Sequence, residues 1–236
     1  MTQKIKNFFF RTKRNILSKT IYRKNFKTPE FYDFYFSQPQ KKYIVQVGGN
    51  DGIQSDPLRI YFKSKKDYNA VIFEPIKNYY NKLKQLYHNR EDILIKQQYV
   101  SCDQGERKIY YIKPEVCNSV KIDNQNNDWL HGLGSFDKKN IEHLKKNIIS
   151  ESVSPFELKN LNFPKNLLNL LVIDVQGFEL EVLLSLSFNE KIDYIVYEDD
   201  VPYSKKSKKI RKLLSEHNYI LIGRLTWIDQ VYKKIV

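Results

Sequence analysis

A glycine-rich turn follows the first apolar segment of the 236-residue chain. Residues 43–47 have the apolar character of a buried strand, and Gly48-Gly49-Asn50-Asp51-Gly52 comes directly after them. Glycines at such a point let a cofactor approach the backbone closely, and ligands of open α/β sheets bind where parallel strands end. The spacing differs from the G-x-G-x-x-G pattern of dinucleotide-binding proteins. The turn therefore indicates either a cofactor loop or an ordinary strand-to-helix connection.

Two acidic residues stand directly after other apolar segments. Glu74 follows residues 70–73 and lies 22 residues after Gly52, close to the offset of about 20 residues at which an acid binds a ribose. Its two oxygens could accept both ribose hydroxyls, or it could be a helix-start charge before Pro75. Asp174 ends a later apolar run, where a carboxylate could deprotonate an acceptor hydroxyl or help to hold a metal ion. Its alternative role is to cap the following helix.

These residues must be positioned by alternating strands and helices. Short apolar runs predict strands, and stretches with apolar residues three or four positions apart predict helices. Strands are expected at residues 43–47, 70–73, 93–100, 108–112, 170–175, 192–197, 219–223 and 230–235, and helices at 57–65, 79–87, 138–149, 180–186 and 208–217. The alternation predicts an α/β fold around a mostly parallel sheet, with an antiparallel C-terminal edge strand. Such a sheet suits a class I methyltransferase and a dehydrogenase alike.

Five sequence blocks together resemble the FkbM family of S-adenosylmethionine-dependent methyltransferases. They are, in order, Gly48-x-Asn50-Asp51-Gly52 with Asp56-Pro57-Leu58, and residues 71–75, 129–137, 171–177 and 195–198. The resemblance extends over about residues 43–232. It implies a class I (Rossmann-like) methyltransferase fold, S-adenosylmethionine as the cofactor, and O-methylation, often of sugar hydroxyls in glycans or natural products.

The resemblance also implies roles for particular residues. Gly48, Asn50, Asp51 and Gly52 would shape the cofactor loop, Glu74 would hold the ribose, Ser101 and Cys102 would lie beside the adenine, and Asp174 would face the methyl group. Three residues depart from the family pattern, since Gln176 stands in place of a usual Glu, Cys102 in place of a common acid and His131 in place of a small residue. Because Gln176 replaces the usual Glu, the metal requirement stays open. His131 could be specific to this acceptor.

Methyl transfer to a sugar hydroxyl is helped by a base, because the hydroxyl is a poor nucleophile. Asp174 is the first candidate, followed by Glu198 and by His131, whose ordinary pKa of about 6.5 suits proton transfer near neutrality. His131 could equally be an ordinary loop residue, and Glu198 could only orient backbone amides. Trp129 and Phe136 could stack on a sugar ring, although Phe136 could equally pack inside the loop.

The formal net charge of +13 is concentrated in two segments. Residues 1–27 contain nine basic residues and no acidic one, residues 204–212 contain six more, and the rest of the chain carries −2. This distribution argues against a groove that follows nucleic acid. A nucleic-acid-binding protein or nucleic-acid methyltransferase stays an alternative, as does a cofactor-binding module without catalysis. Residues 2–24 could form a basic amphipathic helix that contacts an anionic membrane, or a helix that docks on the domain or a partner subunit.

The composition indicates where the protein works and how it is organised. Two cysteines predict reduced thiols and a cytoplasmic protein, peripheral at the inner membrane face if residues 2–24 bind lipid. No apolar run is long enough to span a membrane, and the histidines show no metal-ligand spacing. Residues 31–36 are apolar enough to predict core packing or a homo-oligomer contact. We expect an extension at residues 1–40, a catalytic domain at 41–236 and an acceptor-covering insertion at 113–165.

Overall fold

The computed structural model describes residues 28–54, 56–64, 67–117, 130, 132–142, 147–199, 204–226 and 228–235. The expected helix at residues 2–24 lies outside these ranges, as do Trp129 and His131. Within them, no helix is both long enough and apolar enough to cross a lipid bilayer.

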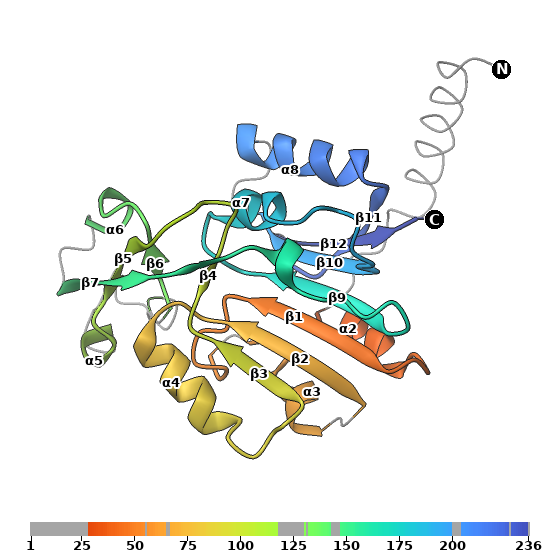
Figure 1. Cartoon of the computed structure of the whole chain (residues 1–236), viewed down its shortest axis with the longest axis horizontal. Helices are drawn as coiled ribbons and strands as arrows, with labels where there is room; N and C mark the ends of the chain where they lie inside the picture. Colours follow the sequence, from red (N-terminus) through yellow and green to blue (C-terminus); the bar gives the residue numbers. More distant parts are fainter. Residues whose placement is uncertain are drawn as a thin grey trace.

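A seven-stranded sheet forms the centre of the molecule (Figure 1). Its strands, in spatial order, are β11 (Tyr219–Arg224), β12 (Asp229–Lys234), β10 (Tyr194–Glu198), β9 (Leu168–Ile173), β1 (Lys42–Val47), β2 (Tyr68–Phe73) and β3 (Ile93–Lys96). Neighbouring strands are parallel except at β12, which runs antiparallel to both β10 and β11. The predicted mostly parallel α/β sheet is confirmed, and its antiparallel strand lies one place in from the edge.

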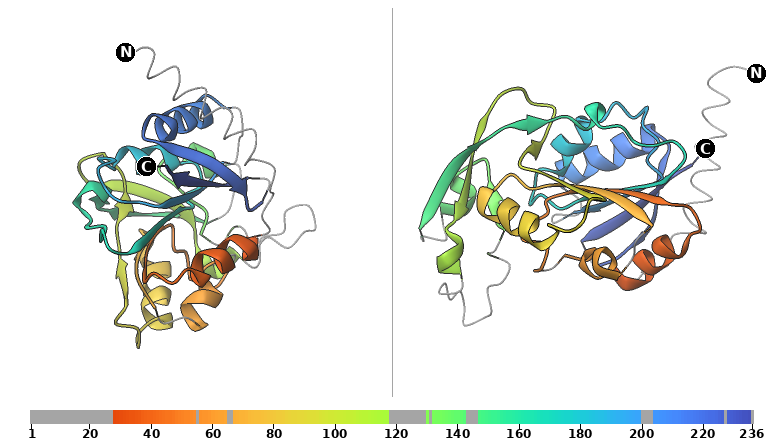
Figure 2. Two further views of the ribbon diagram at one scale, coloured as in Figure 1. Left: turned by 90° about the vertical axis from the view of Figure 1, so that its right-hand side faces the viewer. Right: turned by 60° about the horizontal axis from the view of Figure 1, so that its bottom comes forward.

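Helices cover both faces of the sheet, as the burial of a parallel sheet requires. On one face, α2 (Thr28–Ser37), α3 (Arg59–Ser64) and α4 (Lys77–Leu86) pack on a core that includes Ile44 and Leu170. On the other face, α7 (Glu179–Leu184), α8 (Lys205–Glu216) and the 3₁₀ turn η2 (Leu158–Asn160) pack around Val45 and Leu171. Figure 2 shows α2 and α8 on opposite sides of the sheet. The two cores are separate because alternate side chains of a strand point to opposite faces.

The aromatic segment at residues 31–36 belongs to α2 and packs in the core. Phe31 and Tyr35 are fully buried, and the Tyr35 hydroxyl donates a hydrogen bond to the Leu168 carbonyl oxygen at 2.8 Å. Phe36 stacks on Tyr61 of α3, with 4.5 Å between the ring centroids. These rings therefore fix α2 to the sheet, which is the first of the two roles expected for the segment.

An insertion between β3 and β9 forms a smaller sheet beside the carboxyl ends of the central strands (Figure 1). In it, β5 (Arg107–Ile112) pairs antiparallel with β6 (Gly134–Ser135) and β7 (Ile148–Val153). A separate short pair joins β4 (Tyr99–Val100) to β8 (Pro155–Phe156) in parallel. Two short helices, α5 (Pro114–Cys117) and α6 (Lys139–Glu142), complete the described part of the insertion.

Two expectations for this insertion are wrong, and a third is confirmed as a strand of the smaller sheet. The strand expected at residues 93–100 is two strands, because the chain leaves the central sheet after β3 and β4 pairs with β8 instead. The strand expected at 108–112 belongs to the smaller sheet as β5. The helix expected at 138–149 is wrong in its last part, because Ile148–Val153, which includes β-branched residues, forms β7 against β5, while α6 covers Lys139–Glu142. In each case a strand partner that is distant in sequence decides the structure.

Candidate active site

The glycine turn after β1 lies against the end of β9. Gly48 has a φ of +89°, and a Cβ atom at this position would lie 1.8 Å from the carbonyl oxygen of Asp174. The Asp174 amide donates a hydrogen bond to the Val47 carbonyl oxygen at 2.9 Å. The two backbones therefore meet so closely that only glycine fits, and the turn and Asp174 share one rim of the sheet.

Glu74 is buried at the end of β2 and braces this turn, with only 5% of its surface exposed. Its Oε2 accepts a hydrogen bond from the Asn50 amide and its Oε1 accepts one from the Ile76 amide, both at 2.8 Å. Burial raises the pKa of Glu74 to about 8, although the two hydrogen bonds oppose the shift. Each carboxylate oxygen has a second lone pair that can accept a hydroxyl donor.

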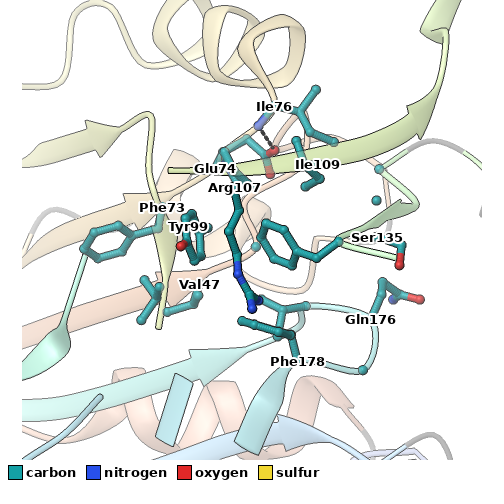
Figure 3. A pocket seen from close by; sticks show the side chains of 18 of the residues that line it. Val47, Phe73, Glu74, Ile76, Tyr99, Arg107, Ile109, Ser135, Gln176 and Phe178 are labelled. Carbon is teal, nitrogen blue, oxygen red and sulfur yellow. Dashed lines mark hydrogen bonds between the residues drawn. The ribbon is translucent and has the colours of Figure 1, made fainter. Parts of the chain in front are cut away.

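A first cavity, of about 520 Å³, lies between the central sheet and the smaller sheet (Figure 3). Its volume is in the range of about 300–1,000 Å³ found for small-molecule sites. Apolar and aromatic side chains dominate its lining, among them Val47, Phe73, Ile76, Tyr99, Ile109, Phe136 and Phe178. The guanidinium of Arg107 lies 5.6 Å from the ring centre of Phe136. With Glu74 in its wall, the first cavity can hold a purine and its ribose.

A second cavity, of about 490 Å³, lies on the α2 side of the same rim. The two cavities share part of their lining, namely Gly48, Glu74, Gly132, Asp174 and Gln176. Only the second cavity reaches Tyr32 of α2, Gln46 of β1 and Glu198 of β10. A group bound in one cavity can therefore meet a group bound in the other beside Asp174.

Asp174 and Glu198 are held together by Gln176 at the junction of the two cavities. The Gln176 Nε2 donates to Asp174 Oδ1 and to Glu198 Oε2, each at 3.1 Å. Gln176 has a φ of 51°, a left-handed conformation that costs a non-glycine residue roughly 1–2 kcal/mol. Desolvation raises the pKa of Asp174 above its usual range, while hydrogen bonds with Glu198 and Gln176 oppose the rise. A carboxylate with a raised pKa beside a cavity is suited to accept a proton.

Five predicted site residues line the cavities, namely Gly48, Asn50, Glu74, Asp174 and Glu198. Asp51 and Gly52 line neither of them. The Asp51 carboxylate accepts hydrogen bonds from the amides of Ile53 and Gln54, both at 2.9 Å, and so shapes the turn. A Cβ atom at Gly52 would lie 2.7 Å from Leu83 of α4, so this glycine permits close packing of the loop.

The residues expected beside the adenine lie outside both cavity linings. Ser101 is fully buried, and its hydroxyl accepts a hydrogen bond from the Asp103 amide at 3.0 Å. Cys102 is exposed as a free thiol. Val100, one residue earlier, does line the first cavity. His131, the third candidate base, is outside the described residues.

Several residues of the site were given no role from the sequence. In the first cavity these are Arg107 and Phe178, and in the second Tyr32, Gln46 and Asp56. One signal was available, because Gln46 is a polar residue inside an otherwise apolar strand. Among the described residues, no group of three or more His, Cys, Asp or Glu side chains is arranged to hold a metal ion.

The strand order, with one antiparallel strand placed before the edge, is that of the class I S-adenosylmethionine-dependent methyltransferases. The methyltransferase FkbM domain matches residues 46–221 of the chain. The chain therefore belongs to the FkbM methyltransferase family, whose members transfer methyl groups from S-adenosylmethionine.

Solved structures with a similar fold share little sequence with this chain. Methyltransferase FkbM from Methylobacillus flagellatus KT is 12% identical, with a TM-score of 0.48, and the match covers 81% of this chain and 43% of that one. Aeropyrum pernix fibrillarin with bound S-adenosyl-L-methionine is 9% identical, with a TM-score of 0.44 and coverage of 82% and 66%. A TehB-like methyltransferase from Corynebacterium glutamicum is 10% identical, with a TM-score of 0.45 and coverage of 99% and 100%. The chain thus spans less than half of the FkbM structure. Curated proteins gave no match.

The residues at the rim fit S-adenosylmethionine. Glu74 presents a buried carboxylate at the wall of the first cavity, where it can accept hydrogen bonds from ribose hydroxyls. The apolar side chains around it can cover an adenine ring. Asp174 and Gln176 also line this cavity where it meets the second one, and the reactive end of the cofactor must reach that junction.

We expect Glu74→Ala to weaken binding of S-adenosylhomocysteine by about 10- to 100-fold, because hydrogen bonds to a charged group contribute about 1.5–3 kcal/mol. Isothermal titration calorimetry measures the affinity directly. Glu91→Ala, which removes an exposed carboxylate before β3, is the matched control. Unchanged affinity in a folded Glu74→Ala protein would remove Glu74 from the cofactor site.

Binding at Glu74 should also release protons. The pKa of about 8 keeps the carboxyl group of the free protein mostly neutral at pH 7. Ribose hydroxyls that donate to it favour its charged form and lower the pKa. The binding enthalpy should therefore depend on the ionisation enthalpy of the buffer near pH 7, and Glu74→Gln should abolish that dependence.

Proposed function

We propose that this chain transfers the methyl group of S-adenosylmethionine to a hydroxyl oxygen of a sugar, in a glycan, a polysaccharide or a natural-product precursor. The observation that carries the proposal is the position of Asp174 between two cavities. One cavity suits the adenosine part of the cofactor, and the other has acidic and amide side chains in its lining that suit a hydroxyl-rich acceptor. The carboxylate is therefore in place to receive the acceptor proton.

The chain's own residues would act mainly by positioning and by proton transfer. The bound cofactor supplies an electrophilic methyl group, so the acceptor oxygen needs alignment with it more than activation. As bonding develops, the hydroxyl loses its proton, and Asp174 is the base at the junction. Gln176 fixes the orientation of the Asp174 carboxylate, and Glu198 accepts a hydrogen bond from the same amide.

The charge of the second cavity favours a sugar over nucleic acid. Its described lining includes five carboxylates, Asp56, Glu74, Asp174, Glu198 and Asp229, and no Lys or Arg. A phosphate backbone is bound through Lys and Arg, so a polyanion would be repelled from this cavity. Neutral hydroxyl groups, in contrast, can donate hydrogen bonds to carboxylate oxygens.

Transfer of radioactive methyl groups from S-adenosylmethionine to defined acceptors tests the function. The full chain should label neutral or amino-bearing glycans, and the label should survive alkaline hydrolysis, because a methyl ether is stable where a methyl ester is not. Mass spectrometry after perdeuteromethylation, which marks every other hydroxyl with a CD3 group, would locate the hydroxyl. Label found on RNA or DNA would support the nucleic-acid alternative, and cofactor binding without labelling of any glycan would support a non-catalytic module.

A further inference from the structure

Several residues that line the second cavity carry a buried oxygen atom without a hydrogen-bond partner, and we call this part of the lining its inner end. It is formed by Tyr32 of α2, Gln46 of β1, and Gln54 and Asp56 from the segment before α3. The Tyr32 hydroxyl, the Oε1 atoms of Gln46 and Gln54 and the Oδ2 of Asp56 have no partner among the described residues. Tyr32 is 1% exposed and Gln46 is 4% exposed, so bulk solvent does not satisfy them.

Such a cluster is unusual in a folded protein. An unpaired buried polar group costs about 1–3 kcal/mol, and native structures retain only a few of them per 100 residues. Two of these side chains, Gln46 and Asp56, are already fixed by their other polar atoms. The Asp56 Oδ1 accepts hydrogen bonds from the Leu58 amide at 2.9 Å and from Gln46 Nε2 at 3.3 Å. These two side chains are therefore held with one oxygen each available to a bound group.

The chemistry of these atoms specifies what they can bind. The Tyr32 hydroxyl can donate or accept a hydrogen bond, whereas the other three oxygens are amide and carboxylate oxygens that only accept. A ligand at this end must therefore donate several hydrogen bonds. The four acidic side chains of the lining other than Glu74, with no Lys or Arg beside them in the described chain, make the cavity negative. An ammonium group provides three donors and a compensating positive charge. A carboxylate or phosphate group provides neither.

We propose that the inner end of the second cavity binds a primary ammonium group of the acceptor, which makes the substrate an amino sugar or another hydroxyl-rich amine. This inference rests on the proposed function, since it places the amine near Asp56 and the hydroxyl to be methylated near Asp174. The α-ammonium of the cofactor has the same chemistry. Its neighbouring carboxylate, however, would be repelled by the same carboxylates that attract an acceptor amine.

Binding of matched monosaccharides to the full chain, loaded with S-adenosylhomocysteine, tests the charge preference. The four sugars are glucose, glucosamine, 6-amino-6-deoxyglucose and glucuronate, and each of the last three differs from glucose at a single carbon. At least one of the two amines should bind about tenfold more tightly than glucose, which corresponds to about 1.4 kcal/mol, and glucuronate should bind more weakly than glucose. Two amines that bind no better than glucose, or glucuronate that binds as well, would overturn the proposal.

Asp56→Asn tests the residue assigned to the amine. Asn keeps the oxygen that caps Leu58 and places an amide donor where the unpaired Oδ2 was, so the amine preference should fall to the level of glucose. Affinity for S-adenosylhomocysteine should stay within about twofold. A tenfold loss of that affinity would assign the inner end to the cofactor amine and overturn the acceptor proposal. Asp67→Asn, at an exposed carboxylate before β2, is the matched control.

A second variant guards against a folding defect in Asp56→Asn. Gln54→Leu removes an unpaired acceptor of the same cluster, and it should lower the amine preference several-fold with an unchanged melting temperature. Because these measurements record binding, they are separable from the proposed function. Sugar methylation without any charge preference would end this inference alone, whereas a charge preference without methylation of any sugar would end the proposed function alone.

Discussion

Asp174→Asn is expected to lower turnover by about 10²- to 10⁴-fold, the usual effect of removing a general base, while cofactor affinity stays within a few-fold. Asn keeps an oxygen that can accept the hydrogen bond from Gln176 Nε2, so the rim geometry is preserved. It cannot, however, take a proton from the acceptor. Steady-state kinetics and calorimetry on the same preparation separate the two effects, and wild-type turnover in this variant would exclude Asp174 as the base.

The same assignment predicts a pH dependence. A base must be deprotonated to act, and desolvation raises the pKa of Asp174. The acid limb of the kcat/KM profile should therefore lie above the usual pKa range of Asp. Gln176→Ala removes a hydrogen bond that stabilises the charged carboxylate, so it should move the acid limb to still higher pH. An acid limb that stays in place in Gln176→Ala would contradict this role for Gln176.

Gly48→Ala is expected to cost several kcal/mol of the free energy of unfolding, a range reached only by substitutions with a specific steric cause. A Cβ atom 1.8 Å from the Asp174 carbonyl oxygen forces β1 and β9 apart at the rim. The backbone at Gly48 is also left-handed, a conformation that disfavours any residue with a side chain. Urea unfolding measures the loss, and cofactor binding should be lost with it.

Gly105→Ala is the matched control for this effect. Gly105 has a φ of +97°, but no atom lies within 4 Å of where its Cβ would be. It should therefore show only the conformational cost, roughly 1–2 kcal/mol. If Gly48→Ala and Gly105→Ala lose the same free energy of unfolding, the close approach of Gly48 to Asp174 contributes nothing to the effect of Gly48→Ala.

The sequence predicted the rim residues well because topology alone brings them together. Glu74 and Asp174 each follow an apolar run, and parallel strands place their carboxyl ends at one edge of the sheet. Ser101 and Cys102 do not line the cavity, because their position depends on β4. That strand pairs with β8, a segment more than 50 residues later, and no local pattern reveals such a partner.

The second cavity was missing from the prediction for a different reason. Its inner end combines Tyr32, Gln46 and Asp56, which come from a helix, a strand and a loop. The direction of each side chain depends on how α2 packs, and that follows from aromatic contacts such as Phe36 on Tyr61. Spacing in the sequence carries no information about this packing, although the polar Gln46 in an apolar strand and Asp56 in the first block of the family resemblance give local hints.

The position of β12 affects how the chain reaches its folded state. β12 lies between β10 and β11 but follows both in the sequence, so the ribosome makes both neighbours before the strand that separates them. Until then, the Tyr-Ile-Val-Tyr edge of β10 is open to pairing with another chain, or prematurely with β11. When β12 enters between β10 and β11 it closes this edge, and it also places Asp229 opposite Glu198. The pairing of β12 with its two neighbours is thus one late folding event with two effects. It protects the chain from misassembly during synthesis, and it completes the second cavity.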